Sequence, residues 1–480
     1  MKKTRKNKDP KAAAKGKKAD PPFSPAPARV NASLVIFILA LTVRLVYLYE
    51  SSDNPAFFAP IIDANYYDRS ANDLIRKGVF SDQFFFQGFF YPLFLAGVYA
   101  LTGSSMVWAK VFQALLGAAA CALTCLLGEK AFSRKVGVIA GAFASLYAPL
   151  FFFGGELLPA VWGVFWSVWL LFILMVAVEK KSIALCLVLG SSMPLSVLSV
   201  PTFLPFCGLA AVWLAWKWAA ENLGWSKIAG RLAVAALAFA VAAFPVGFMS
   251  MKEKGTFAIL PTSGAVNLYI GNNPDTDRTI AIRPGIRYDA MRNLAFKEGV
   301  VARTEEERNR YLIGKVISYA LSEPVSFMKG MGFKILQFLC SRELTNNEDI
   351  YLFRDWSVLL SLLSWKVGGF GFPFGVLLPL AVAGIVLCRK QIPLPLLLFP
   401  AAYAFSVVLV HVNNRYRLPA VPVLCILAAA GLVHLIAAFQ RKNGGLLTKS
   451  IGGMAAALFV AVLPGPLSRR RLISGPRPII

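Results

Sequence analysis

The run NASLVIFILALTVRLVYLY, at residues 31–49, decides the fold class, and its only charged side chain is Arg44. About 20 apolar residues in a row are long enough for a helix to cross the hydrocarbon core of a bilayer. No small-residue cleavage pattern follows the run, so we expect it to remain as a membrane span and not to be removed as a signal peptide.

Apolar runs of similar length recur along the chain. Of its 480 residues, 57% are hydrophobic and 16% are charged, whereas a soluble domain carries about 25% charged residues. The further candidate spans lie at about 106–127, 136–153, 158–178, 182–199, 201–219, 231–250, 367–388, 392–410, 418–438 and, with a weaker pattern, 450–466. We therefore predict an all-α polytopic membrane protein with about 10–11 transmembrane helices and a small α-rich external domain.

The last candidate span is short. Its apolar run stops at Pro464, and crossing would place Arg469, Arg470 and Arg471 on the outer side. Two alternatives stay open for residues 450–466, a short span or a helix that lies in the membrane interface.

The charge distribution orients the spans. Residues 1–29 hold ten Lys and Arg against two Asp and lack apolar periodicity, so we expect a disordered basic tail on the cytoplasmic side. The loops that then face the cytoplasm are basic, whereas the first external loop, 50–105, holds six acidic and three basic residues. The net charge of +25 therefore indicates orientation and contact with anionic membrane lipids, and nucleic acid is not expected as a partner.

This topology divides the chain into five parts. They are the tail at 1–29, an N-terminal transmembrane catalytic module at 30–250 with the loop 50–105, an external periplasmic domain at 251–360, C-terminal transmembrane helices at 361–466 and a basic tail at 467–480. In the external domain, Thr304 followed by Glu307 predicts a capped amphipathic helix, and PVSFMKGMGFKILQFL predicts an interfacial helix. The first loop is expected to form two helices at the outer surface.

The sequence lacks the motifs of common cofactors. It has no phosphate-binding loop, dinucleotide fingerprint, zinc signature or nucleophile elbow, so chemistry that needs ATP or nicotinamide is not expected. Its seven cysteines show no metal-ligand spacing, and the chain has only two histidines. Carboxylates and arginines are therefore the candidates for chemistry.

Two carboxylates stand at the outer ends of spans. Asp63, in PIIDANYYD, lies beside Tyr66 and Tyr67, and Glu156, in FFFGGELLP, is the only charge in a short external turn. A carboxylate between apolar helices is poorly solvated, which raises its pKa and favours proton-accepting or hydrogen-bonding roles. The alternative for Asp63 is an ordinary solvated loop acid, because other acids share its loop.

Basic side chains are also expected at the outer ends of the spans. Arg44 lies near the outer end of the first span, where a guanidinium is unfavourable unless it snorkels or pairs. The segment HVNNRYRLP places His411, Arg415 and Arg417 at the outer mouth of two late spans. Two arginines so placed can clamp a phosphate, and the alternative is that they anchor lipid headgroups. Acids opposite arginines suit a reaction between a lipid-linked phosphate and an external acceptor. The leaving phosphate needs cations, and the attacking hydroxyl of the acceptor needs a base.

The order of these motifs resembles the GT-C superfamily of polytopic membrane glycosyltransferases, which includes protein O-mannosyltransferases and aminoarabinose transferases. The resemblance is carried by Arg44, by D-x-x-Y-Y-x-x-x-A from Asp63, by YPLFLAGVYALTG, by F-x-G-E-L-L-P around Glu156 and by R-Y-R-L-P-x-x-P from Arg415. The segments SGAVNLYIGNNP (263–274) and RELTNNEDIYLFRD (342–355) resemble bacterial members of glycosyltransferase family 39 type.

The resemblance implies inverting transfer of a sugar from a polyprenyl-phosphate donor to an acceptor on the outer face. It implies that Asp63 is the general base and Glu156 a second acidic residue of the site. Substrate binding is expected from the aromatic and basic side chains, namely Arg44, Tyr66, Tyr67, His411, Arg415 and Arg417. The family motif often has an acidic pair where this chain has Asp63 followed by Ala64. Some relatives bind a divalent metal ion, but no ligand set in this sequence requires one.

The remaining expectations concern partners and alternatives. The donor is a co-substrate, the acceptor is a lipid, glycan or protein, and the enzyme lies in a bacterial inner membrane with its N-terminus in the cytoplasm and its active site facing the periplasm. One alternative is a ligase or polymerase that moves whole glycans from an undecaprenyl carrier. Another is a lipid or sugar transporter or flippase, which charges near the middle of spans and duplicated halves would favour.

Overall fold

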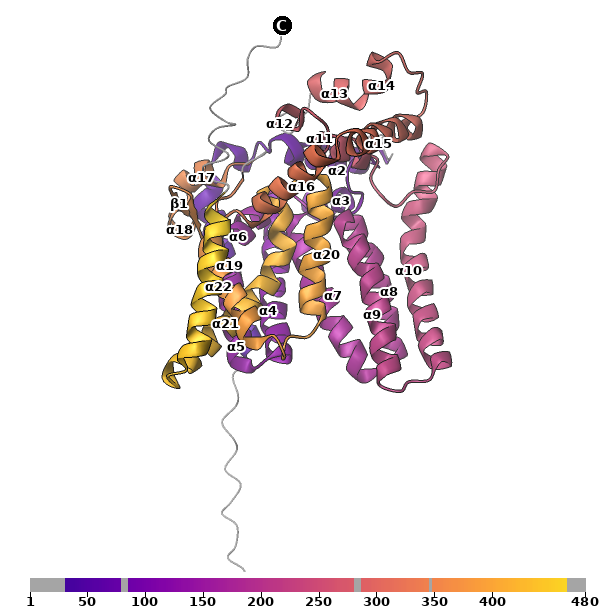
Figure 1. Ribbon diagram of the computed structural model, residues 1–480. Coiled ribbons are helices and arrows are strands. Elements are labelled where there is room, and N and C mark those ends of the chain that lie inside the picture. Colours follow the sequence, from indigo (N-terminus) through magenta and orange to yellow (C-terminus); the bar gives the residue numbers. More distant parts are fainter. Residues whose placement is uncertain (1–30, 79–84, 280–285, 345–347, 464–480) are drawn as a thin grey trace, which may run out of the picture. The chain divides into compact units, whose positions relative to one another are not determined.

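Helices dominate the computed structural model of the chain (Figure 1). The structure describes residues 31–78, 85–279, 286–344 and 348–463. The predicted tails at 1–29 and 467–480 lie outside these described residues.

Each predicted span overlaps helical structure, but the one at 367–388 begins too early, because Trp365–Val367 and Phe370–Phe372 form a β-hairpin and the helix begins at Phe374. The apolar helices are α1 (Ala32–Glu50), α4 (Met106–Ala131), α5 (Arg134–Leu146), α6 (Ala148–Gly155), α7 (Ala160–Lys180), α8 (Ile183–Ser199), α9 (Leu204–Ala220), α10 (Trp225–Lys254), α19 (Phe374–Cys388), α20 (Pro395–Val410), α21 (Val421–Gln440) and α22 (Gly444–Val462). Within the described residues, 7 helices are long and apolar enough to cross a membrane, and the bent pair α5–α6 raises the number to 8. α8, α19 and α20 are apolar but shorter. The prediction of an all-α polytopic membrane protein is confirmed.

The predicted span at 136–153 is bent. Helix α5 ends at Leu146, Tyr147 is extended, and α6 restarts at Ala148 with Pro149 in its first turn, so the two axes meet at 51°. Proline cannot donate a backbone hydrogen bond to a continuing helix, which explains the break. The bend matters because α6 ends in the turn that carries Glu156.

The weak segment at 450–466 belongs to a longer helix than its apolar run suggested. Helix α22 begins at Gly444, where the Asn443 side chain accepts a hydrogen bond from the backbone N–H of Leu446, and it packs against α19. With 19 residues, α22 meets the length and hydropathy of a span, which favours the spanning alternative.

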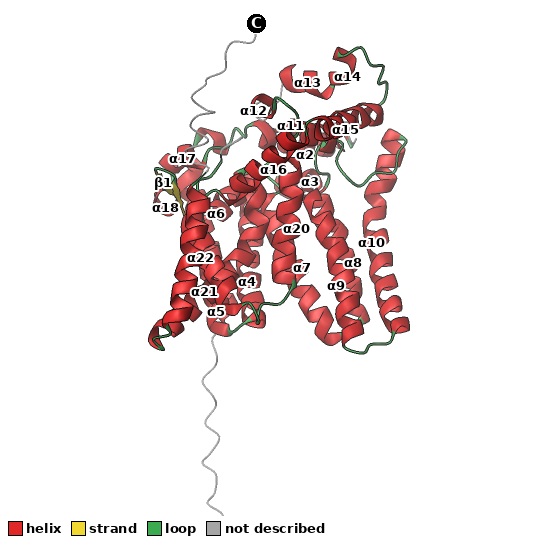
Figure 2. Cartoon of the chain, viewed as in Figure 1, coloured by secondary structure: helices red, strands yellow, loops and turns green. Residues whose placement is uncertain are grey.

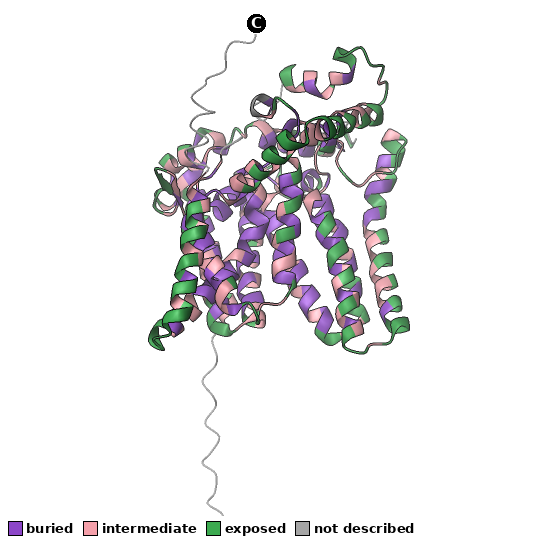
Figure 3. Cartoon of the chain, in the orientation of Figure 1, coloured by how far each residue is buried: buried purple, intermediate pink, exposed green. Residues whose placement is uncertain are grey.

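Close backbone approach holds the C-terminal helices together. A Cβ atom on Gly384 of α19 would lie 2.0 Å from the carbonyl oxygen of Leu427 in α21, and one on Gly431 of α21 would lie 2.3 Å from the carbonyl oxygen of Leu380. Small residues at helix crossings allow the van der Waals packing that drives helix association in membranes. Elsewhere, large apolar side chains face outward, including Leu237 of α10 and Phe459 of α22, and exposed residues line both helices in Figure 3.

The connections at one end of the bundle hold the shorter elements. The helices there are α2 (Ile62–Lys77), α3 (Phe90–Thr102), α11 (Gly264–Gly271), α12 (Thr276–Thr279), α13 (Ile286–Arg292), α14 (Leu294–Lys297), α15 (Glu305–Ser322), α16 (Pro324–Leu339), α17 (Ile350–Phe353) and α18 (Val358–Leu363). Short 3-10 turns join them, namely η1 (Ser51–Asp53), η2 (Pro55–Phe57), η4 (Pro201–Phe203), η5 (Arg354–Trp356) and η6 (Asn414–Ala420). The strands β1 (Trp365–Val367) and β2 (Phe370–Phe372) pair antiparallel with Lys366 opposite Gly371 (Figure 2).

Several local predictions for this end are confirmed. The loop 50–105 forms the two helices α2 and α3, and α15 begins with the predicted capping box, in which Thr304 and Glu307 hydrogen-bond reciprocally. The segment predicted as an interfacial helix is helical, as α16, and its location in the interface stays a prediction. In Figure 1, α2, α3 and α11–α16 gather at the same end of the spans, and this end also carries the candidate site.

Candidate active site

Asp63 and Arg415 form an ion pair although 352 positions separate them in the sequence. Asp63 lies in the first turn of α2, and Arg415 lies in η6, whose start is capped by the Asn413 side chain. Both charged side chains are mostly buried, with 12% and 14% exposure for Asp63 and Arg415. The structure thus brings together the predicted base and one predicted phosphate ligand.

The backbone before Asp63 is in an unusual conformation. Ile62 has φ = 50°, in the left-handed region that β-branched residues rarely adopt. Strain of this kind persists only where the surrounding structure enforces it, and it concentrates at functional sites. Ile62 directly precedes Asp63, so this backbone conformation adjoins the candidate base.

Two tyrosines and a glutamine surround Asp63. Gln87 donates a hydrogen bond from Nε2 to Asp63 Oδ1 at 3.4 Å, and the Tyr67 hydroxyl donates to Gln87 Oε1 at 2.7 Å. The ring of Tyr66 packs edge-on against that of Tyr67, and burial raises the pKa of Tyr66 to about 12. Both predicted tyrosines therefore lie at the site, and Tyr66 stays a protonated hydrogen-bond donor at physiological pH.

The turn that carries Glu156 is held from helix α4. Gln113 donates hydrogen bonds to the backbone carbonyl oxygens of Gly154, at 2.8 Å, and Glu156, at 2.7 Å, and Tyr91 donates its hydroxyl to Gln113 at 2.5 Å. The Glu156 side chain is buried, and burial raises the pKa of its carboxyl, while the nearby Lys110 ammonium opposes the shift. Glu156 thus has the poorly solvated setting that the sequence predicted.

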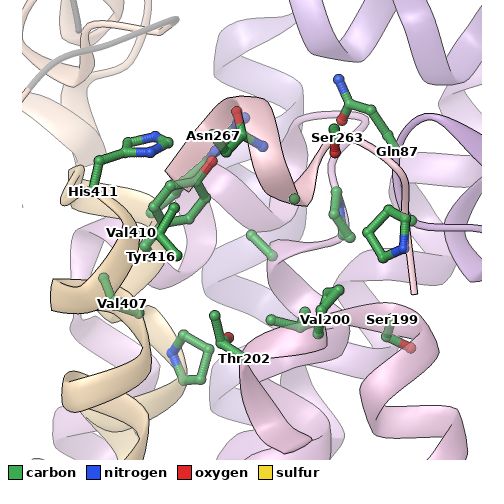
Figure 4. Close-up of a pocket in the computed structure, with 18 of the residues that line it drawn as sticks. Gln87, Ser199, Val200, Thr202, Ser263, Asn267, Val407, Val410, His411 and Tyr416 are labelled. Carbon is green, nitrogen blue, oxygen red and sulfur yellow. The ribbon is translucent and has the colours of Figure 1, made fainter. Parts of the chain in front are cut away.

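A cavity of about 230 Å³ is lined by Arg415, the partner of Asp63. Figure 4 shows other side chains of its wall, among them Gln87 and His411. Its wall comes from the end of α8, from η4, α11, α20 and η6, and includes Tyr67, Gln87, His411 and Arg415. The wall is mostly apolar, with a few convergent polar groups, which is the usual character of a small-molecule site.

His411 ends helix α20 and lines this cavity. Its ring lies 5.4 Å from that of Tyr416, centroid to centroid. Burial lowers the pKa of His411 to about 4, and the charges of Arg415 and Lys334 lower it further. The imidazole is therefore neutral above pH 5, suited to hydrogen bonding with a bound ligand and not to holding a charge.

The other two predicted arginines point elsewhere. Arg417 donates to Glu343 and to the carbonyl oxygen of Cys340, both at 2.5 Å, and its guanidinium lies 3.9 Å from the Phe374 ring centroid. Arg44 donates to the carbonyl oxygen of Ala40 at 3.0 Å, within its own helix. Neither lines the cavity, and each has local partners, so their role in substrate binding stays a prediction.

Four residues of the site were not predicted from the sequence. Gln87, Lys110, Gln113 and Glu348 all lie around Asp63 or Glu156. Lys110 and Gln113 had a usable signal, because a cation and an amide stand out in the apolar run MVWAKVFQALLG. Gln87 had the same signal, because it is the polar side chain in FFFQGFF, whereas Glu348 sits in the polar run ELTNNED and carried none. Among the described residues, no group of three His, Cys, Asp or Glu could hold a metal ion.

One prediction concerns the turn before Glu156. A Cβ on Gly155 would lie 2.7 Å from Cε1 of Tyr47, whose buried ring packs against Phe151, whereas a Cβ on Gly154 meets nothing within 4 Å. We expect Gly155→Ala to lower the free energy of unfolding by about 1–3 kcal/mol, measured by thermal unfolding in detergent. Gly154→Ala is the matched control and should stay near wild type. Equal stability of the two variants would contradict the packing described.

Comparison with known proteins gives a likeness of fold. No protein-family model matches the chain, and a search of curated proteins finds no match. The archaeal oligosaccharyltransferase AglB from Archaeoglobus fulgidus, solved with an inhibitory peptide and a dolichol-phosphate, superposes with a TM-score of 0.51 at 14% identity, over 91% of this chain and 55% of that one. This chain has the GT-C fold.

Two further structures match more loosely. A second AglB structure, with zinc and sulfate, gives a TM-score of 0.49 at 14% identity over 90% of this chain and 53% of that one. ArnT from Cupriavidus metallidurans, bound to undecaprenyl phosphate, gives a TM-score of 0.38 at 16% identity, over 85% of this chain and 79% of that one. The chain spans about 55% of the length of AglB, so the GT-C likeness concerns the fold.

Proposed function

We propose that this protein is a membrane glycosyltransferase that moves a sugar from a polyprenyl-phosphate donor to an acceptor on the outer side, with inversion. The observation that carries the proposal is the Asp63–Arg415 pair beside the cavity. It places a candidate base and a candidate phosphate ligand at one point in an apolar wall. The GT-C fold supports this class of reaction.

The proposed reaction uses the two groups separately. Asp63 accepts the proton of the acceptor hydroxyl as the acceptor oxygen bonds to the anomeric carbon. The bond between that carbon and the phosphate oxygen breaks, and the polyprenyl phosphate departs with the electron pair. Arg415 stabilises the charge on the leaving phosphate, which a guanidinium can bind in a bidentate manner.

The ion pair makes these roles interdependent. The structure pairs Arg415 with Asp63, so the guanidinium engages the carboxylate that the proposed reaction needs as a base. A donor phosphate competes with Asp63 for the guanidinium. Binding of the donor therefore releases the carboxylate at the moment when an acceptor can use it.

An apolar groove supports a lipid-linked donor. It has a volume of about 570 Å³ and lies between α8, α9 and α10, lined by side chains such as Met193, Leu204 and Phe239. Ser199 at the end of α8 and Thr202 in η4 line the cavity, whereas Met193 of α8 and Leu204 at the start of α9 line the groove, so the continuous segment α8–η4–α9 contributes to both. We assign the groove to the polyprenyl chain and the cavity to the phosphate and sugar.

The test is a transfer assay. The purified protein is placed in proteoliposomes with a polyprenyl phosphate that carries a radiolabelled sugar, together with a cell-envelope extract. We expect label to become covalently attached to acceptor material as free polyprenyl phosphate accumulates. Labelled sugar that crosses the bilayer without covalent transfer would instead favour a transporter, and transfer of whole glycans only would favour a ligase.

A further inference from the structure

Glu348 is a deeply buried carboxyl that the proposed reaction has not yet used. Its exposure is 2%, and its Oε1 atom has no hydrogen-bond partner among the residues that the structure describes. Burying a charged carboxylate without a partner is strongly unfavourable, so such a group either pairs, loses its charge or awaits a ligand.

The charged groups that face Glu348 come from three other elements. They are Arg415 of η6, Glu156 of the turn after α6 and Asp63 of α2. Glu348 therefore adjoins the candidate phosphate ligand and both candidate acids. Its closest electrostatic partner is Arg415, the residue that also pairs with Asp63.

Glu343 and Asp349, described residues on either side of this part of the chain, are both held by hydrogen bonds. Glu343 accepts one from Arg417, and the Asp349 side chain accepts one from the backbone N–H of Tyr351, at 2.9 Å, to begin α17. Arg417 and Arg415 both belong to η6, so one short segment holds Glu343 and interacts with Glu348.

These surroundings favour the neutral form of Glu348. Burial, together with the charges of Glu156 and Asp63, raises the pKa of the Glu348 carboxyl to about 8, while Arg415 acts in the opposite direction. At pH 7 most of the carboxyl is protonated and presents an O–H donor with no acceptor. A neutral donor beside Arg415 suits an anion that brings its own negative charge.

We propose that Glu348 is part of the phosphate-binding site and donates its O–H to a non-bridging oxygen of the donor phosphate held by Arg415. The inference rests on the proposed function and adds a residue to it. An ionised Glu348 would repel the same phosphate and would draw the guanidinium away from it. Binding of the lipid phosphate should therefore require the protonated carboxyl.

The test measures the affinity of the protein in nanodiscs for polyprenyl phosphate at pH 7 and pH 9. The second ionisation of a phosphate monoester lies near pH 6, and arginine stays charged, so neither changes over this range. With a carboxyl that titrates near pH 8, we expect the wild-type Kd to rise about tenfold from pH 7 to pH 9.

Three variants isolate the carboxyl. Glu348→Gln keeps the shape and an N–H donor but cannot ionise, so its Kd should change less than about twofold over the same range. Glu348→Ala should bind weakly at both pH values. Glu306→Gln, an exposed carboxylate of α15, is the control and should retain the wild-type pH dependence.

The outcomes separate the two proposals. A wild-type Kd that does not change with pH, or a tenfold change that persists in Glu348→Gln, would overturn the role of Glu348 and leave the proposed function standing. Absence of binding to polyprenyl phosphate in the wild type at both pH values would overturn the proposed function itself.

Discussion

Asp63→Asn should lower the rate of sugar transfer by about 10²- to 10⁴-fold, the usual contribution of a general base. The amide has nearly the same size as the carboxylate and can still accept a hydrogen bond from Arg415, but it cannot take the proton of the acceptor hydroxyl. The Kd for polyprenyl phosphate should stay the same or fall, because the donor no longer competes with a carboxylate for Arg415. Initial rates at saturating donor, together with equilibrium binding, check both parts.

Asp73→Asn is the matched control for this experiment. Asp73 lies in the same helix, α2, but is exposed and paired with Lys77 at 2.9 Å. Its rate should stay within about twofold of wild type, because an exposed pair contributes little. Transfer that continues unchanged in Asp63→Asn would remove Asp63 as the base.

Loss of the Arg417–Glu343 pair should destabilise the protein more than any other single substitution considered. Both side chains are almost fully buried, with 4% and 1% exposure for Arg417 and Glu343. Arg417→Met leaves the Glu343 carboxylate buried without its partner, which typically costs about 3–5 kcal/mol. Thermal unfolding in detergent should show a large fall in Tm.

Two variants make this prediction specific. The double variant Arg417→Met with Glu343→Leu should recover much of the lost stability, since it leaves no uncompensated charge. Arg310→Met removes an exposed partner of Glu306 and should change stability by less than about 1 kcal/mol. If Arg417→Met weakened lipid phosphate binding and left Tm unchanged, Arg417 would be a phosphate ligand after all.

Most of the fold follows from the apolar runs. Runs of about 20 residues fix where helices must lie, since each span satisfies its own backbone hydrogen bonds. The apolar run at 136–153 predicts a span, and the structure adds that this helix is broken before Pro149, so that its second part ends in the Glu156 turn. The start of α22 was missed because a polar first turn, capped by Asn443, precedes its apolar run.

The site was predictable only in part. Because successive loops lie on alternate sides of the membrane, the predicted topology places Asp63 and Arg415 at the same end of the bundle. Which arginine faces the cavity, however, depends on local geometry. Residues two apart in a 3-10 helix, such as Arg415 and Arg417 in η6, point in different directions, and the sequence gives them equal weight. The place of Glu348 in the site could not be predicted from the sequence, because its charged neighbours lie on three other segments of the chain.

The central claim is that a lipid phosphate binds at Arg415 and displaces Asp63. A cryo-electron microscopy structure of the wild-type protein in nanodiscs with polyprenyl phosphate tests it most directly. The account predicts phosphate density in the cavity against the Arg415 guanidinium, with the lipid chain along α8 and α9 and the Asp63 carboxylate separated from Arg415. Phosphate density bound away from Arg415, with the Asp63–Arg415 pair intact, would contradict it.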